Sequence, residues 1–202
     1  MRARLVFIAW LAASSGPVVA AESAEPVLTD GAPSPGLTLM VGDKRQWDTF
    51  VGVNSVSSAS GFLSVEPDAE SGELRASWTG KGEAQLFLAY DGPRDFGEWV
   101  SKDSALVAEI KVLAKPRKKV TLKMGCGYPC GAEADIGKLL SAMPEGEWLR
   151  VSFDLACFRD GGLDVNNVDV PFLMLTRGKM SLALADVQIV PGVGPDATIR
   201  CR

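Results

Sequence analysis

Apolar side chains recur at every second position along most of the chain, which is the pattern of β-strands with one face on a core. The clearest run covers residues 83–90. It places two sets of side chains on opposite faces: Gln85, Phe87 and Ala89 on one, and Leu86, Leu88 and Tyr90 on the other. Because both faces carry apolar residues, we predict that this strand is central in its sheet.

The same alternation predicts further strands over residues 105–113, 120–124, 148–155, 170–176 and 180–189. Turn-forming Gly, Pro and Asp residues separate several of them. Short strands joined by such turns are typical of an antiparallel sandwich. We therefore predict an all-β fold, an antiparallel β-sandwich.

One segment departs from the period of two. Within residues 135–143, the apolar residues Ile136, Leu139, Leu140 and Met143 fall at helical spacing. The sequence thus predicts one short helix, which we expect to lie across an end of the sandwich.

The N-terminal residues have the composition of a secretory signal peptide. Arg2 and Arg4 precede an apolar run over residues 5–13, and small residues lead to a cleavage site after Ala20 or Ala21. The apolar run is too short to span a bilayer. These features predict a periplasmic or secreted protein without membrane insertion.

The remaining boundaries follow from composition. After a signal peptide over residues 1–21, residues 22–36 lack periodicity and are rich in Pro, Ser, Gly and Ala, which predicts a flexible linker. Residues 37–191 then form one β-sandwich domain, which is large enough to build its own core. Residues 192–202 are expected to form a loose C-terminal tail that Cys201 could pin.

Composition also argues against several classes of function. The 202 residues contain no histidine, which removes Ser-His-Asp and Cys-His catalysis and the commonest metal ligand. Acidic residues outnumber basic ones by 25 to 21. The densest basic run, Lys115-Pro116-Arg117-Lys118-Lys119, separates two predicted strands, and we interpret it as a solvated loop. We expect neither nucleic acid nor an anionic membrane as a partner.

Carboxylates fall mostly in turn-like stretches. We interpret them as solvated loop charges in preference to the acid/base pair of a glycosidase. Their oxygens would suit calcium better than zinc, so a structural calcium ion is an alternative without assigned residues. We predict no other cofactor.

All four cysteines follow the predicted signal peptide: Cys126, Cys130, Cys157 and Cys201. An even number in an exported protein indicates disulfides. Three pairings are formally open, and the spacing favours Cys126–Cys130, which leaves Cys157–Cys201. A redox centre is the alternative, but the redox motif has two intervening residues where this chain has three. We prefer structural disulfides, the first of which would join a strand to the predicted helix.

Aromatic side chains are the candidates for sugar binding, because the C–H face of a sugar stacks on an aromatic ring. We expect Trp148, which opens a strand, and Trp78 to pack in the core. Trp99 lies in a polar segment over residues 94–99, and Tyr128 lies between the two closely spaced cysteines. Trp99 and Tyr128 are therefore the predicted ligand-binding residues.

An ordered series of motifs in the second half resembles a known domain family. The motifs are Cys126-Gly127-Tyr128-Pro129-Cys130, Glu147-Trp148, Leu155-Ala156-Cys157-Phe158, Gly161-Gly162, Pro171-Phe172 to Thr176, Gly178, and Leu182 to Val187. The series resembles the ExoP-type galactose-binding-like domain at the C-terminus of some bacterial exo-β-glucan hydrolases of glycoside hydrolase family 3. The resemblance covers residues 39–190 and implies a jelly-roll β-sandwich of the carbohydrate-binding-module type, associated with β-glucan metabolism.

The resemblance does not carry hydrolase activity with it. In those enzymes two large catalytic domains precede the module, and a mature chain of about 180 residues is too short to hold them. We expect a non-catalytic exported module that binds a β-glucan or related saccharide, or that docks onto a glycan-active enzyme. A scaffold that has lost the sugar ligand is the alternative, and a small glycoside hydrolase is the least favoured interpretation.

Overall fold

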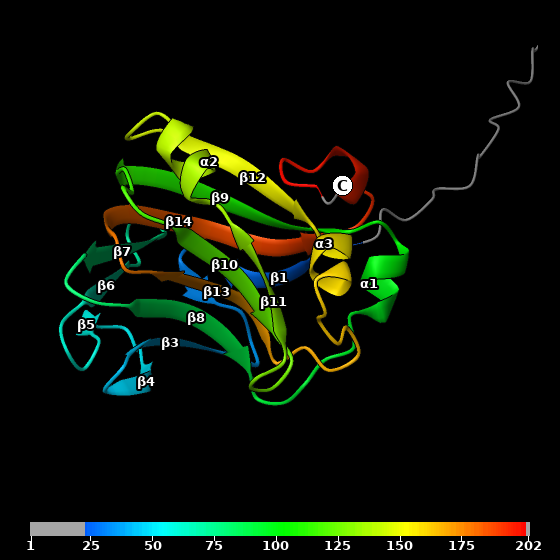
Figure 1. Cartoon of the computed structure of the whole chain (residues 1–202), viewed down its shortest axis with the longest axis horizontal. Coiled ribbons are helices and arrows are strands. Elements are labelled where there is room, and N and C mark those ends of the chain that lie inside the picture. Colours follow the sequence, from blue (N-terminus) through cyan, green and yellow to red (C-terminus); the bar gives the residue numbers. More distant parts are fainter. Residues whose placement is uncertain (1–22, 201–202) are drawn as a thin grey trace, which may run out of the picture.

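The computed structural model describes residues 23–200, which fold into two antiparallel β-sheets packed face to face (Figure 1). The first sheet contains, in spatial order, β12 (Trp148–Asp154), β9 (Ala105–Ala114), β14 (Lys179–Val190), β7 (Glu73–Thr79), β6 (Leu63–Asp68) and β5 (Val56–Ser57). Beside β14, β1 (Glu25–Thr29) and β2 (Ala32–Pro33) extend it. The second sheet contains β11 (Gly131–Asp135), β10 (Val120–Gly125), β13 (Val170–Thr176), β8 (Ala84–Tyr90), β3 (Leu37–Asp43) and β4 (Gln46–Phe50).

The predicted all-β sandwich is confirmed, and so is the core-facing side predicted for the strand over residues 83–90. In β8, which lies inside its sheet between β13 and β3, Leu86 and Leu88 point into the core. In β9, Leu106 and Ile110 do the same. Burying a side chain of this size stabilises the fold by about 1.5–3 kcal/mol, so the alternation along the strands is what holds the two sheets together. The opposite face of β8 therefore points away from the core.

Three short α-helices and one 3-10 helix cover the ends of the sandwich in the described part of the chain: α1 (Gly97–Ser101), α2 (Gly137–Ala142), α3 (Leu155–Asp160) and η1 (Gly194–Asp196). The predicted helix is confirmed as α2. The prediction of a single helix is wrong, because α1 and α3 lie together at the other end (Figure 1). With five and six residues, they are too short to show a helical period in the sequence.

The predicted flexible linker is wrong where the structure describes it. Residues 25–29 form β1, which pairs with β14, and both Val27 and Leu28 are buried. The register shifts between Pro26 and Leu28, and this irregularity lets two consecutive apolar residues face inward. For that reason the segment shows no period of two.

The predicted loose tail is also wrong up to residue 200. The N–H of Ile199 donates to the carbonyl of Ser152, and the N–H of Asp154 donates to the carbonyl of Ile199, both at 3.0 Å. Ala197 is buried. The tail is thus docked along the edge strand β12, by long-range contacts that its local sequence does not reveal.

Two predictions lie outside the described residues: the signal peptide over residues 1–21 and the position of Cys201. Within residues 23–200, no helix combines the length and apolar character that crossing a membrane would require.

Candidate functional site

The outward face of the second sheet holds a groove of about 660 Å³. It is formed by β4, β8, β10 and β13 together with the loop between β10 and β11. Its lining includes three aromatic residues, four polar or charged ones and several aliphatic ones: Trp47, Phe87, Tyr128, Glu83, Gln85, Lys123, Asp169, Val170, Leu173 and Leu175. A volume of this size is typical of small-ligand sites.

Strand register explains how the floor of the groove is built. Phe87 in β8 lies opposite Leu173 in β13. Leu173 in turn lies opposite Lys123 in β10. Because paired residues on adjacent strands share a face, this row forms an apolar strip that ends at an ammonium group.

Trp47 stands on one rim, with 43% of its surface exposed. Its backbone carbonyl accepts a hydrogen bond of 3.2 Å from Nε2 of Gln85 on the floor. In the hairpin of β3 and β4, Gly42 in β3 allows the backbone of Trp47 in β4 to lie close to it, because a Cβ atom at position 42 would overlap that backbone. The position of the rim relative to the floor is therefore set by Gln85 and Gly42, in neighbouring strands.

The carboxylate of Asp43 fixes the turn of the same hairpin through hydrogen bonds. Its side chain is buried; Oδ1 accepts from the N–H of Arg45 at 2.9 Å, and Oδ2 accepts from the N–H of Ser60 at 2.6 Å. Burial raises the pKa of Asp43, but hydrogen bonds from Arg45, Ser58 and Ser60 outweigh it and lower the pKa to about 2. The carboxylate is thus ionised at neutral pH, and it ties the β3–β4 turn to the loop before β6.

Tyr128 stands on another part of the rim and is fully exposed. It lies in the five-residue loop that the Cys126–Cys130 disulfide closes, with Cα atoms 5.0 Å apart. The N–H of Cys130 donates to the carbonyl of Gly127 at 2.6 Å, and Gly127 has a φ of +83°, a conformation that glycine adopts without strain. The predicted Cys126–Cys130 disulfide is confirmed. It joins β10 to β11, however, and not a strand to the helix.

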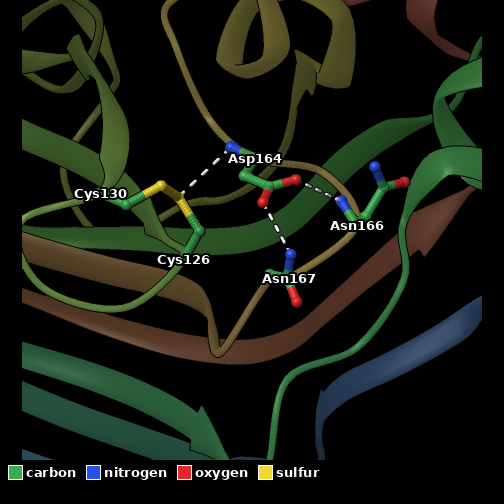
Figure 2. Close-up of a disulfide and its surroundings, with 5 residues drawn as sticks. All are labelled: Cys126, Cys130, Asp164, Asn166 and Asn167. Carbon is green, nitrogen blue, oxygen red and sulfur yellow. Dashed lines mark hydrogen bonds between the residues drawn. A yellow bond between two sulfur atoms is a disulfide. The ribbon is translucent and has the colours of Figure 1, made fainter.

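A second loop supports this disulfide (Figure 2). The N–H of Asp164 donates to Sγ of Cys126 at 3.3 Å. The carboxylate of Asp164 accepts from the N–H of Asn166 at 3.1 Å and from Nδ2 of Asn167 at 2.7 Å. The loop that carries Tyr128 is therefore held by a covalent bond and by a hydrogen-bonded neighbour.

Asp169 places a carboxylate in the groove lining. Its backbone N–H donates to the carbonyl of Gly125 at 3.1 Å, which fixes its position beside β10. Its Oδ1 atom is buried and has no hydrogen-bond partner within residues 23–200. The polar residues of the lining that can pair with ligand hydroxyls include Gln85, which offers an amide, Lys123, which offers an ammonium group, and Asp169, which offers a carboxylate.

The predicted site residues fare differently. Tyr128 lines the groove, whereas Trp99 does not: it is half-buried, packs against the core, and its ring lies 5.7 Å from Nζ of Lys102. The core position expected for Trp78 is confirmed, and its Nε1 donates to the carbonyl of Ala84 at 3.0 Å.

The expected burial of Trp148 is wrong. It is 38% exposed on the edge strand β12, and Nζ of Lys111 lies 4.5 Å from its ring centroid. Trp47 is a groove residue that the sequence does not single out. Its polar neighbours Gln46 and Asp48, in a short strand, are the signal that could have indicated exposure.

The other expectations concern Cys157 and calcium. Cys157 is disulfide-bonded, and its predicted partner Cys201 lies outside the described residues, so that pairing stays a prediction. Within residues 23–200, no group of three or more His, Cys, Asp or Glu side chains is placed to hold a metal ion.

Comparison with known proteins identifies the family. The model of the galactose-binding domain-like family Exop_C matches residues 39–189. The chain belongs to this family. The predicted family resemblance is thus confirmed, and no curated protein matches the chain significantly.

Solved structures with this fold include the exo-1,3/1,4-β-glucanase ExoP from a Pseudoalteromonas species. The match has 17% identity and a TM-score of 0.67, and covers 98% of this chain but 22% of the enzyme. The extra C-terminal domain of ExoP alone matches with 17% identity and a TM-score of 0.64, over 83% of this chain and 92% of the domain. A family 30 carbohydrate-binding module of the cellulase Cel9D-Cel44B from Clostridium thermocellum matches with 13% identity and a TM-score of 0.59, over 85% and 99% of the two chains.

Proposed function

We propose that this Exop_C domain is a non-catalytic carbohydrate-binding module that holds a β-glucan chain in the groove of its second sheet. The observation that carries the proposal is one groove with two exposed aromatic residues on its rim, Trp47 and Tyr128, the largely buried ring of Phe87 in its floor, and polar groups between them. Aromatic rings offer flat apolar surfaces for sugar rings, and the polar groups can pair with hydroxyls.

The two rim residues differ in how they are fixed. Trp47 is tied to the floor through Gln85, and Tyr128 is held on a disulfide-closed loop. Preorganised aromatic groups lose little conformational entropy on binding, which favours affinity. Full burial of one such ring contributes about 1.5–3 kcal/mol, so each should matter by tenfold or more in affinity.

The ion pair of Glu83 supports a binding role of the groove over a catalytic one. The lining includes Glu83 and Asp169. Oε2 of Glu83 accepts a hydrogen bond of 2.7 Å from Nε of Arg177. Glu83 is thus engaged in an ion pair, whereas the acid of a glycosidase must be free to donate a proton to the leaving group.

Calorimetric titration with laminarin, mixed-linkage β-glucan and cello-oligosaccharides tests the proposal. We expect binding of at least one of them, reduced about tenfold or more by Trp47→Ala and by Tyr128→Ala. Trp148→Ala, which removes an exposed tryptophan from the other sheet, is the matched control and should bind as the wild type does. Absence of binding to all three glucans by a folded protein would overturn the proposal.

A partner enzyme follows from the same reasoning. In ExoP a domain of this fold is part of a β-glucanase chain, and we infer that this module brings a glucan-active enzyme to its polysaccharide. The disulfide and the signal-peptide-like N-terminus support a periplasmic or secreted location. Turnover of an aryl β-glucoside by the purified chain would contradict the non-catalytic role.

A further inference from the structure

A second hollow, of about 330 Å³, lies at one end of the second sheet. We name it the basic pocket, because four cationic side chains line it: Lys44, Lys81, Lys118 and Arg177. The ring of Phe62 forms an apolar wall, and Glu83 supplies a carboxylate.

Strand register explains why cations distant in sequence converge here. The ends of four strands of the second sheet lie side by side: Asp43↔Ala84, Ala84↔Thr176 and Thr176↔Val120 are paired positions. Lys44 and Arg177 are the next residues after two of these ends, while Lys81 and Lys118 precede the other two. Each cation therefore comes from a different turn, and only Lys118 belongs to the basic run over residues 115–119 that we interpreted as a solvated loop.

The charge of the pocket is unbalanced. Glu83 is its one carboxylate among the described lining residues, and it is paired with Arg177 through the 2.7 Å hydrogen bond. The lysines thus add positive charge that this carboxylate does not neutralise, in a chain whose net charge is −4. Like charges held close together repel, and a bound anion relieves that repulsion. The pocket is therefore suited to a negatively charged group.

The apolar wall makes the pocket more than a set of surface charges. Phe62 is half-buried, and its ring lies against Gly82 so closely that a Cβ atom there would overlap it. A flat aromatic surface beside ammonium and guanidinium groups suits a sugar ring that carries a carboxylate or a phosphate or sulfate ester.

The basic pocket also adjoins the groove, since Glu83 lines both. We propose that the basic pocket binds the anionic group of an acidic saccharide whose neighbouring residues lie in the groove. This inference rests on the proposed function and extends it: the ligand class becomes a glycan with a uronate carboxylate or a phosphate or sulfate ester at one end of the bound segment.

Paired titrations test the inference. A neutral cello-oligosaccharide is compared with the same oligosaccharide oxidised to the uronate at C6, in about 20 mM and about 500 mM NaCl, which change the screening length severalfold. Glucuronate, inorganic phosphate and sulfate are titrated separately, to distinguish recognition of a carboxylate from that of an ester. The variants are Lys81→Gln/Lys118→Gln in the pocket, and Lys115→Gln/Lys138→Gln as a control with the same net charge.

At low salt we expect the wild type to prefer the oxidised oligosaccharide by about fivefold or more, since each exposed ion pair contributes modestly. The preference should vanish at high salt and in the pocket variant, with affinity for the neutral ligand unchanged. The control variant should keep it. Equal affinity of the wild type for both oligosaccharides would overturn the inference and leave the proposed function standing.

The two proposals can also fail in the opposite way. If Trp47→Ala leaves binding of both oligosaccharides unchanged while the pocket variant abolishes the preference, the saccharide does not bind in the groove. Only binding of the anionic group by the basic pocket then stands. If a preference persists in the pocket variant, the charged group is recognised elsewhere and the inference is refuted.

Discussion

Nε2 of Gln85 donates a hydrogen bond of 3.2 Å to the backbone carbonyl of Trp47. This contact joins the floor of the groove, in β8, to its rim, in β4, although the residues are 38 positions apart in the chain. The groove thus depends on the order of strands in the sheet. β3 lies between β8 and β4, and its Gly42 leaves room for the backbone of Trp47 in β4.

Gly42→Ala should therefore weaken glucan binding. The new Cβ would overlap the backbone of Trp47, so the hairpin must move and carry the indole away from the groove. We expect about a tenfold loss of affinity, with a destabilisation of about 1–3 kcal/mol typical of overpacking. Calorimetry and urea denaturation measure both. Gly92→Ala is the control, since a Cβ there meets nothing within 4 Å, and a loss of affinity in this control would argue against the explanation.

The disulfide offers a second test. Cys126→Ser/Cys130→Ser opens the small loop that carries Tyr128, and the chain-entropy model gives a destabilisation of about 2 kcal/mol for a loop of this size. Because Tyr128 would lose its fixed position, affinity for glucan should fall as it does in Tyr128→Ala. An unchanged affinity in the double variant would show that the disulfide does not preorganise the rim.

Tyr90 provides a prediction about stability. Its hydroxyl is buried without a hydrogen-bond partner within residues 23–200, and burial raises its pKa to about 12, with a contribution from Glu25. Tyr90→Phe should leave the free energy of unfolding unchanged or raise it by up to about 1 kcal/mol, because an unpaired buried polar group is costly.

Thr176→Val is the contrast. The Thr176 hydroxyl donates to the carbonyl of Lys119 at 2.7 Å and accepts from the N–H of Gly178 at 2.9 Å. Its removal should cost about 1–3 kcal/mol in urea denaturation. A larger loss of unfolding free energy in Tyr90→Phe than in Thr176→Val would contradict this prediction.

The low pKa of Asp43 predicts a pH dependence. Its pKa is about 2 in the folded protein against an ordinary value of 3.8, so the ionised form is favoured by folding. That stabilisation is fully present above about pH 4 and is lost as the pH falls from about 4 through about 2. The difference in unfolding free energy between wild type and Asp43→Asn should be constant from about pH 5 to 7 and shrink below about pH 4. A difference that is the same near pH 2.5 as near pH 6 would contradict this assignment.

Much of the fold can be predicted from the sequence because alternation reports burial directly. The pattern places Leu86 and Leu88 of β8 on one face, and both are in the core. The same rule, applied to Trp148, groups it with the polar residues Arg150, Ser152 and Asp154. The expectation of burial follows residue type instead, and it fails because β12 is an edge strand with an exposed face.

The groove cannot be predicted from the sequence. Trp47, Gln85 and Tyr128 come from three separate segments, and their proximity depends on the order of strands in the sheet. The same holds for the basic pocket, whose cations come from four turns. The residues next to Trp99 in the sequence suggest that it is as exposed as Tyr128, but Trp99 lies in α1 and packs against the core.

The most direct test of glucan binding in the groove is a two-dimensional ¹⁵N–¹H NMR titration with a mixed-linkage β-glucan tetrasaccharide. The indole Nε1–H groups give separate reporters at Trp47, Trp78, Trp99 and Trp148. We expect the signals of the Trp47 indole and of the Gln85 side-chain amide to shift as ligand is added, until binding is saturated. The indole signals of Trp78, Trp99 and Trp148 should not shift. Shifts confined to Trp99 or Trp148, with Trp47 unmoved, would contradict binding at this site.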